Sequence, residues 1–196
     1  VTQANNLQAL TSGEILAGAT ISNGDVATLL GLNANSGDET NHYTITITDS
    51  TASAADLTAI NALTDTNVDI SDVTTVTGTI AECNTFYAAA GFANRATDLE
   101  FTVTDTTVDA DALNTLDQNT TGTVTLSNTV TAVNGTGLAV KTVYETASAN
   151  ITGLDTDATV TITGDSGSPT IIQANDLNDI DTVAVSYTHL TLPTRS

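Results

Sequence analysis

An internal repeat constrains the fold of this 196-residue chain more than any other feature. The unit at residues 43–100 resembles the unit at residues 101–158, and Leu57 matches Leu113, which lies 56 residues later. The repeating unit is about 56 residues long, a period typical of proteins built from stacked supersecondary units. Because such a unit cannot bury its apolar face alone, neighbouring units must pack against each other to make a core.

Partial copies flank the two full units. The stretch QANNLQAL at residues 3–10 resembles QANDLNDI at residues 173–180. The sequence therefore predicts a partial unit over 1–42, full units over 43–100 and 101–158, and another partial unit over 159–184.

Each unit divides into two halves of about 28 residues with the same pattern. An alternating run of Thr with β-branched residues, such as TITITD before Ser50, predicts a strand. An Ala- and Leu-rich stretch follows, in which the Leu57-x-x-Ile60 spacing predicts a short helix. Each half-unit is thus expected to contain one strand and one helix.

Capping residues mark the expected helix starts. Ser53 precedes Asp56, Thr79 precedes Glu82 and Ser22 precedes Asp25, the Ser/Thr-x-x-acid pattern that satisfies free N–H groups of the first turn. Thr136 keeps the cap without the acid, since Ala139 follows. The pattern predicts N-caps at Ser22, Ser53, Thr79 and Thr136.

Strand–helix repeats of this length favour an α/β solenoid, with a parallel sheet on one side and short helices on the other. The architecture would resemble that of leucine-rich repeats, although the LxxLxLxxN signature is missing. Two alternatives stay open: an all-β, immunoglobulin-like sandwich and a parallel β-helix. A unit of about 56 residues is short for a sandwich domain of about 100.

The chain is strongly acidic, with 23 acidic and 3 basic residues and a formal charge of −20. So few basic residues argue against binding nucleic acid, and anionic membranes would repel the chain. No apolar run is long enough to span a bilayer, so membrane insertion is not expected. The single cysteine excludes an intrachain disulfide.

The last twelve residues, VSYTHLTLPTRS at 185–196, differ in composition from everything before them. They contain no acid, and they hold one of the two prolines and Arg195. This segment resembles the translated adapter that ends many fragments from environmental sequencing. It is therefore expected to be a non-native tail on a metagenomic fragment of a longer chain.

Segments such as TVTDTTVDADALNTLDQNTTGTV, together with the repeat, resemble the Thr/Asp-rich tandem repeats of very large extracellular, adhesin-like proteins of aquatic bacteria. The resemblance covers residues 1–184. It implies a repetitive structural protein located outside the cell or on its surface, and it implies no particular chemistry.

The residues that could carry catalysis are few. His42 is the only histidine outside the tail and is expected in a solvated loop, whereas Cys83 aligns with apolar positions and is expected in the core. Tyr87 and Tyr144 recur at one repeat position, which favours packing between repeats. No catalytic residue is assigned, and the protein is predicted not to be an enzyme.

Paired carboxylates occur at Asp109 with Asp111 and at Asp155 with Asp157. Acid–base catalysis needs two carboxylates in a cleft with separated pKa values. In a chain this acidic, such pairs arise by chance, and we expect them on the solvated surface.

Calcium is the one cofactor to consider, because it binds six to eight oxygen ligands. Asp49 and Asp105 recur after alternating runs, and the segments 37–41 (GDETN) and 164–169 (GDSGSP) are rich in oxygen atoms. The EF-hand loop is absent, however, as is the Gly-Gly pair of calcium-binding β-rolls. No cofactor is assigned, and turn and cap roles for these aspartates are the simpler interpretation.

The sequence thus predicts a structural or adhesive repeat array on a secreted or cell-surface protein. Such an array contacts neighbouring repeats of its own chain and binds cell-surface components or glycans through many equivalent surfaces. The alternatives are a calcium- or glycan-binding repeat module, and a stalk segment of a larger extracellular enzyme.

Overall fold

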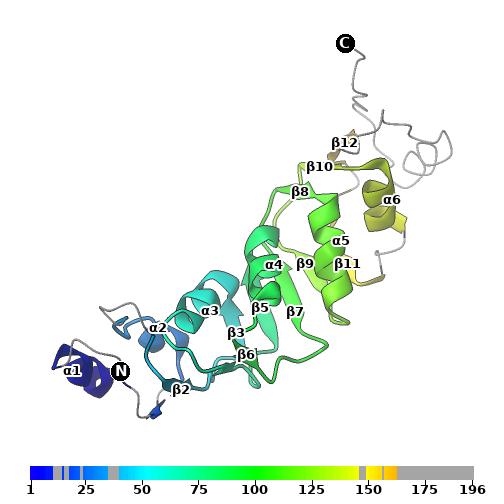
Figure 1. Ribbon diagram of the computed structural model, residues 1–196. Helices are drawn as coiled ribbons and strands as arrows, with labels where there is room; N and C mark the ends of the chain where they lie inside the picture. The colour runs from blue at the N-terminus through cyan, green and yellow to red at the C-terminus, as the bar shows by residue number, and fades with distance from the viewer. Residues whose placement is uncertain are drawn as a thin grey trace.

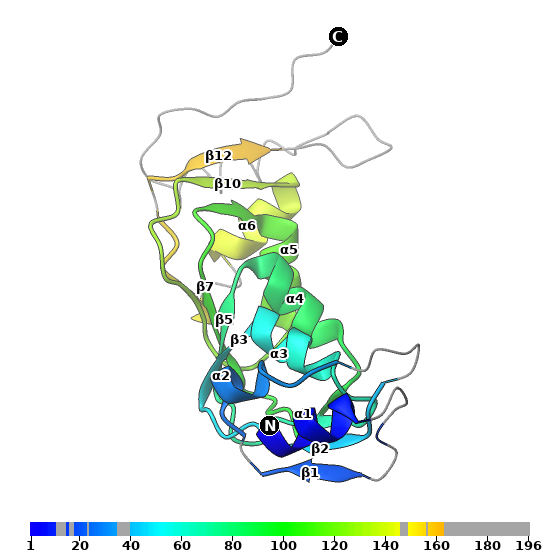
Figure 2. The ribbon, with the colours of Figure 1, turned by 90° about the vertical axis from the view of Figure 1, so that its left-hand side faces the viewer.

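A computed structural model describes residues 1–10, 15, 18–22, 24–34, 40–145, 149–155 and 157–162. The fold is α/β, built from short helices and parallel strands. The described elements form an elongated body that runs from α1 at one end to β12 at the other (Figure 1). Strand β1 lies at the same end as α1 (Figure 2). Within the described residues, none of the sheets closes into a barrel.

The helices are short, and those from α2 to α6 pack side by side along the body. Figure 2 shows α3, α4 and α5 on one side and strands β3, β5 and β7 on the other. The helix bounds are α1 Thr2–Ala9, α2 Val26–Leu29, α3 Ala54–Asn61, α4 Ile80–Ala88, α5 Ala110–Asn119 and α6 Gly137–Glu145.

The largest sheet has five parallel strands in the order β11-β9-β7-β5-β3. Their bounds are β3 Thr51–Ser53, β5 Thr75–Gly78, β7 Glu100–Val103, β9 Val124–Leu126 and β11 Ile151–Thr152. Val76 pairs with Phe101, and Phe101 pairs with Val124, so apolar residues form a file on one face. All three are fully buried, which places the core between this sheet and the helices.

Shorter sheets extend the body at each end. The strands β1 Ala19–Ile21 and β2 Tyr43–Ile45 pair near α1, and β4 Val68–Asp69 pairs with β6 Phe92–Ala93. At the far end the order is β12-β10-β8, with bounds β8 Thr107–Asp109, β10 Ala132–Gly135 and β12 Thr159–Ile162. Every strand pair among the described residues is parallel.

The structure corrects the prediction of one strand in each half-unit. Two strands precede each of α3, α4 and α6, as β4 and β5 do before α4, and three precede α5. Turn-forming polar residues divide the alternating runs: the Asp69 carboxylate accepts the Ser71 N–H at 3.0 Å between β4 and β5. The strands therefore cover two sides of the core rather than one.

The sequence repeat and the sheet ladder have different periods. In the five-stranded ladder, Val76 and its partner Phe101 are 25 residues apart, and two such steps fall short of the unit of about 56 residues. As a result, β2 and β7 align in sequence but belong to different sheets. One sequence unit therefore spans two helices, and strands at equivalent positions of successive units belong to different sheets.

Three of the four predicted caps are confirmed. Ser53 accepts the Asp56 N–H at 3.0 Å, Thr79 and Glu82 form a capping box, and Thr136 accepts the Ala139 N–H at 3.2 Å. The prediction for Ser22 is wrong, because α2 begins at Val26 with Asp25 as its N-cap. An Asp is as good an N-cap as Ser, so the helix start moves three residues along.

Candidate functional site

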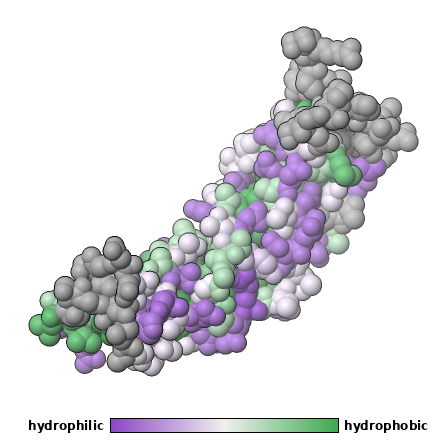
Figure 3. All heavy atoms as spheres, viewed as in Figure 1, coloured by the Kyte–Doolittle hydropathy of each residue, from purple (hydrophilic) through white to green (hydrophobic). Residues whose placement is uncertain are grey.

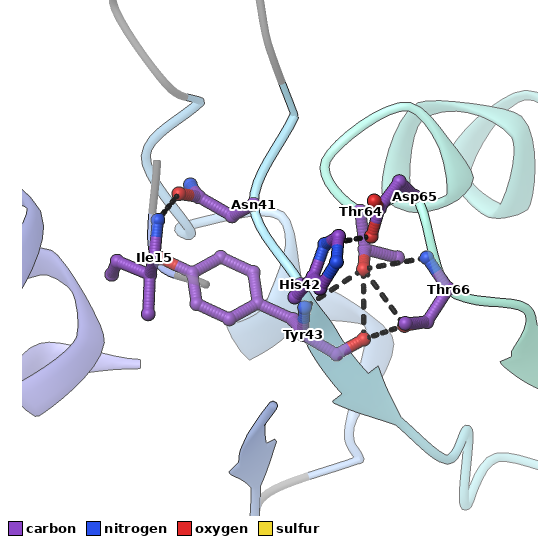
Figure 4. Close-up of polar contacts among 7 residues, drawn as sticks. All are labelled: Ile15, Asn41, His42, Tyr43, Thr64, Asp65 and Thr66. Carbon is purple, nitrogen blue, oxygen red and sulfur yellow. Dashed lines mark hydrogen bonds and ion pairs between the residues drawn. The ribbon is translucent and has the colours of Figure 1, made fainter. Parts of the chain in front are cut away.

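The only histidine of the repeat region lies in a polar cluster where β2 begins (Figure 4). His42 Nδ1 lies 2.6 Å from the Asp65 carboxylate, and both side chains are 39% exposed. Next to it, the Thr64 hydroxyl accepts the Tyr43 N–H at 2.9 Å and donates to the Tyr43 carbonyl at 2.8 Å. The Thr66 hydroxyl also donates to that carbonyl.

A His–Asp pair could orient an imidazole as a general base, but it needs a hydroxyl or thiol to activate. The nearby Thr64 hydroxyl is instead bonded to the backbone of Tyr43. On the other side, Asn41 is fully buried and its side-chain oxygen accepts the Ile15 N–H at 2.8 Å. The cluster therefore joins β2 to the segments before and after it, and among the described residues the ionisable partner of the imidazole is Asp65.

Cys83 is fully buried in α4, as expected of a core residue. Burial raises the pKa of its thiol to about 12, and the nearby Glu82 and Asp105 add to the shift. A thiol with such a pKa stays protonated at neutral pH and is a poor nucleophile or metal ligand.

The recurring tyrosines pack between elements, as expected from the repeat. The Tyr87 ring lies 6.5 Å from that of Phe101, while Tyr144 is 6% exposed and donates to the Asp155 carbonyl at 3.4 Å. Burial, and secondarily Asp155, raise the pKa of Tyr144 to about 12.

Several aspartates bind the start of a helix in an adjacent layer of the stack. The Asp49 carboxylate accepts the Val26 N–H of α2, and the Asp105 carboxylate accepts the Ile80 N–H of α4, both at 2.8 Å. Asp111 accepts the Thr136 N–H at 3.1 Å, at the start of α6. These carboxylates satisfy free N–H groups at the positive ends of helices and tie adjacent layers together.

The paired carboxylates have separate structural roles. Asp109 is the N-cap of α5 and accepts the Ala112 N–H at 2.8 Å, whereas Asp111 binds Thr136. Asp155 accepts the Asp157 N–H at 2.8 Å in a local turn. The first pair thus serves two different helices, and the second lies in a single turn, so the contacts of Asp109, Asp111 and Asp155 are those of capping and turn formation.

The calcium candidates divide in the same way. Asp49 and Asp105 bind helix starts, as described above. Most of segment 37–41, all of segment 164–169 and the tail 185–196 lie outside the described residues. In the described ranges, no three His, Cys, Asp or Glu side chains gather closely enough to hold a metal ion together.

Sequence reasoning missed the role of Arg95. Its guanidinium donates to the carbonyls of Tyr87 at 2.5 Å, Ala89 at 3.1 Å and Phe86 at 3.3 Å, which end α4. It also lies over the rings of Phe86, Tyr87 and Phe92. A cation that closes a helix C-terminus is stabilising, but no sequence pattern signals an arginine six to nine residues beyond the carbonyls.

An open groove lies between α3 and α4 and has a volume of about 510 Å³. Figure 3 shows weakly apolar surface over the helical side of the body, among polar residues. The titratable side chain that lines the groove is Glu82, which is already held in the capping box of α4. The groove is lined by Ala54, Ala55, Thr58, Ala59, Ala62, Ala81, Glu82 and Thr85.

The outer face of the five-stranded sheet is of a different kind. Inward residues such as Val76 and Phe101 are buried, so their neighbours Thr77 and Thr102 point outward. Thr77 and Thr102 pair across the strands, and both are half-buried. The sheet therefore presents hydroxyl groups in register to solvent.

Comparison with known proteins gave no match among protein-family models, curated proteins or solved structures. In the part of the chain that the structure describes, no helix has the length and apolar character needed to cross a membrane.

Proposed function

We propose that this chain is a segment of a repeat solenoid that serves as a structural or adhesive array on a secreted or cell-surface protein. The observation that carries the proposal is the bonding between successive layers. Parallel strands pair one layer to the next, and Asp49, Asp105 and Asp111 each bind a helix start in the neighbouring layer. Stability of this kind grows with each added layer, as solenoid architecture requires.

The distribution of polar groups supports a structural role. The carboxylates discussed above act as helix caps or form turns, the thiol is buried, and Arg95 closes a helix. The side chains best suited to chemistry are thus committed to holding the fold. An array of equivalent layers instead offers repeated surfaces, and weak contacts multiplied over many layers give strong attachment.

Surface location is tested by labelling intact source cells with an antibody raised against the chain. Staining of unpermeabilised cells, or recovery of the antigen from the medium, is expected. Staining that requires permeabilisation would contradict the proposal.

Calcium is tested by thermal melting followed by circular dichroism, first with calcium and then with a chelator. A melting temperature that does not change is expected for an array held by hydrogen-bonded caps. A large rise with calcium would replace this account with that of a calcium-binding repeat module, because a ligand that binds only the folded state raises its stability.

A further inference from the structure

A file of hydroxyl side chains crosses the whole five-stranded sheet on its outer face. Each member pairs with the next in parallel register across the strands. The file consists of Ser53, Thr77, Thr102, Thr125 and Thr152. The Ser53 hydroxyl already caps α3 by accepting the Asp56 N–H, and the Thr152 hydroxyl donates to that of Thr125 at 3.2 Å. The hydroxyls of Thr77 and Thr102, in the middle of the file, make no side-chain hydrogen bond to another described residue and are free to bond to water.

The same face is almost uncharged, although the chain carries a formal charge of −20. Thr51 and Thr75 form a second file beside the first, and it continues to Glu100, the one charged residue at the outward positions of these strands. The acids are placed at turns and helix starts instead, as Asp49 and Asp105 are. The face is therefore polar by hydroxyl groups, with a methyl group on every threonine.

The hydroxyls of the file repeat across the strands, and Thr51 and Thr75 add a short second row, in which the Thr75 hydroxyl also donates to Glu100 at 3.4 Å. Neighbouring strands lie about 4.8 Å apart, and alternate residues along a strand lie about 6.7 Å apart. A rigid ligand surface that repeats at similar distances could meet several hydroxyls at once without ordering a flexible partner. The oxygen atoms on the faces of hexagonal ice repeat at distances close to these two.

We propose that the outer face of the five-stranded sheet binds ice, with the hydroxyl file anchoring an ordered layer of water. The hydroxyls hold water at lattice positions, and the methyl groups between them favour ordered water in the gaps. A polysaccharide surface fits less well, because no aromatic ring lies at the outward positions of these strands to stack on a sugar. A cation fits less well, because Glu100 is the only carboxylate there.

This inference names a ligand for the proposed array. It rests on the proposed function only in that both require the stacked sheet. The two can fail separately: surface labelling tests the array's location, whereas ice affinity tests this face. An array on the cell surface that ignores ice would keep the first proposal and overturn the second.

The test is ice affinity of the purified chain, measured by ice recrystallisation in frozen sucrose and by the shape of single ice crystals near the melting point. Growth of ice grains is expected to slow at micromolar protein, and single crystals are expected to become faceted. Unchanged grain growth and round crystals would overturn the proposal.

Substitutions locate the surface. Thr102→Tyr and Thr125→Lys each raise a large side chain from the middle of the file, and either is expected to remove most of the effect. The matched control is Thr115→Tyr, because Thr115 is exposed on α5, on the helical side of the body. Circular dichroism checks that all variants fold. If folded Thr102→Tyr or Thr125→Lys were as active on ice as the control, the assignment to this face would be wrong. Binding to chitin or cellulose with none to ice would also contradict the proposal.

Discussion

Helices α4 and α6 occupy the same place in successive repeat units but are held differently. Both receive a carboxylate from the next or preceding layer, Asp105 for α4 and Asp111 for α6. Only α4 has a capping box, formed by Thr79 and Glu82, and only its C-terminus is closed by Arg95. Helix α6 keeps the threonine cap alone, through Thr136.

Their neighbours differ as well. Helix α4 packs between α3 and α5, whereas α5 is the described helix that packs against α6. Both helices bury their inward side chains fully, Phe86 in α4 and Val143 in α6, but α6 leaves a large apolar side chain outside, because Leu138 is 71% exposed. The comparison teaches that the repeat supplies the framework, and that the position in the stack decides how much each helix gains from packing.

The largest expected effect comes from the helix between these two. Leu113 of α5 is fully buried, and Leu113→Ala is expected to lower the free energy of unfolding by about 2–5 kcal/mol, because it leaves a cavity. Leu138→Ala on the exposed side of α6 is the matched control and should change it by less than about 0.5 kcal/mol. Urea unfolding measures both, and similar effects would mean that the two positions are equally packed.

Removing the closure of α4 should have the next largest effect. Arg95→Ala leaves carbonyls of α4 without their donor and removes the cation above the rings, with an expected loss of about 2–3 kcal/mol. The control Lys141→Ala on α6 breaks an i,i+4 contact of 3.9 Å to Glu145, an arrangement that contributes only about 0.2–0.5 kcal/mol. Equal losses in chemical denaturation would show that Arg95 adds no more than a surface charge.

Removing either of the two carboxylates that bind across layers should cost less stability than removing Arg95, and the two losses should differ from each other by a smaller amount. Asp105 is half-buried and Asp111 is exposed, so Asp105→Ala is expected to cost about 1–2 kcal/mol and Asp111→Ala about half of that. Asn variants, which keep an acceptor oxygen, should recover part of each loss. Thermal melting of the four variants checks the order, and a larger loss at Asp111 would reverse the comparison.

The smallest effect is pH-dependent. The backbone N–H of Thr79, and then its hydroxyl, lower the pKa of Glu82, so the folded state holds the charged form more strongly than the unfolded state. The resulting stability is present above the unfolded pKa of about 4.3 and is lost as pH falls through the lower folded value. Glu82→Gln should therefore lower the melting temperature at pH 7 and scarcely change it near pH 2.5. An equal change of the melting temperature at both pH values would show that the charge of the Glu82 carboxylate is not the cause.

The local features of the fold could be predicted from sequence because they depend on adjacent residues. The caps at Ser53 and Thr79 follow from a four-residue pattern, and the burial of Leu57 and Leu113 follows from helical spacing. The division of each alternating run into two strands was missed, because Thr and Asp occur both in the strands and in the turn after Asp69.

The contacts between layers could not be predicted in the same way. Asp105 reaches Ile80 across 25 residues, and that separation depends on the length of one layer, which differs from half of the sequence unit. Arg95 likewise depends on how the chain returns after α4. The polar cluster at His42 was expected to be solvated, and its partner Asp65 becomes evident only when the two segments are brought together.

The most direct test of parallel, in-register stacking is a disulfide across neighbouring strands of the exposed face. Thr102 and Thr125 pair in register, so their Cα atoms lie about 4.8 Å apart, within the range that a disulfide spans. After mild oxidation, Thr102→Cys/Thr125→Cys should form an intrachain disulfide in high yield, whereas the buried Cys83 stays reduced. Thr102→Cys/Ser127→Cys, displaced by two residues along the partner chain, should not. Equal yields in the two variants, or a bond only in the displaced one, would contradict the stacked parallel array.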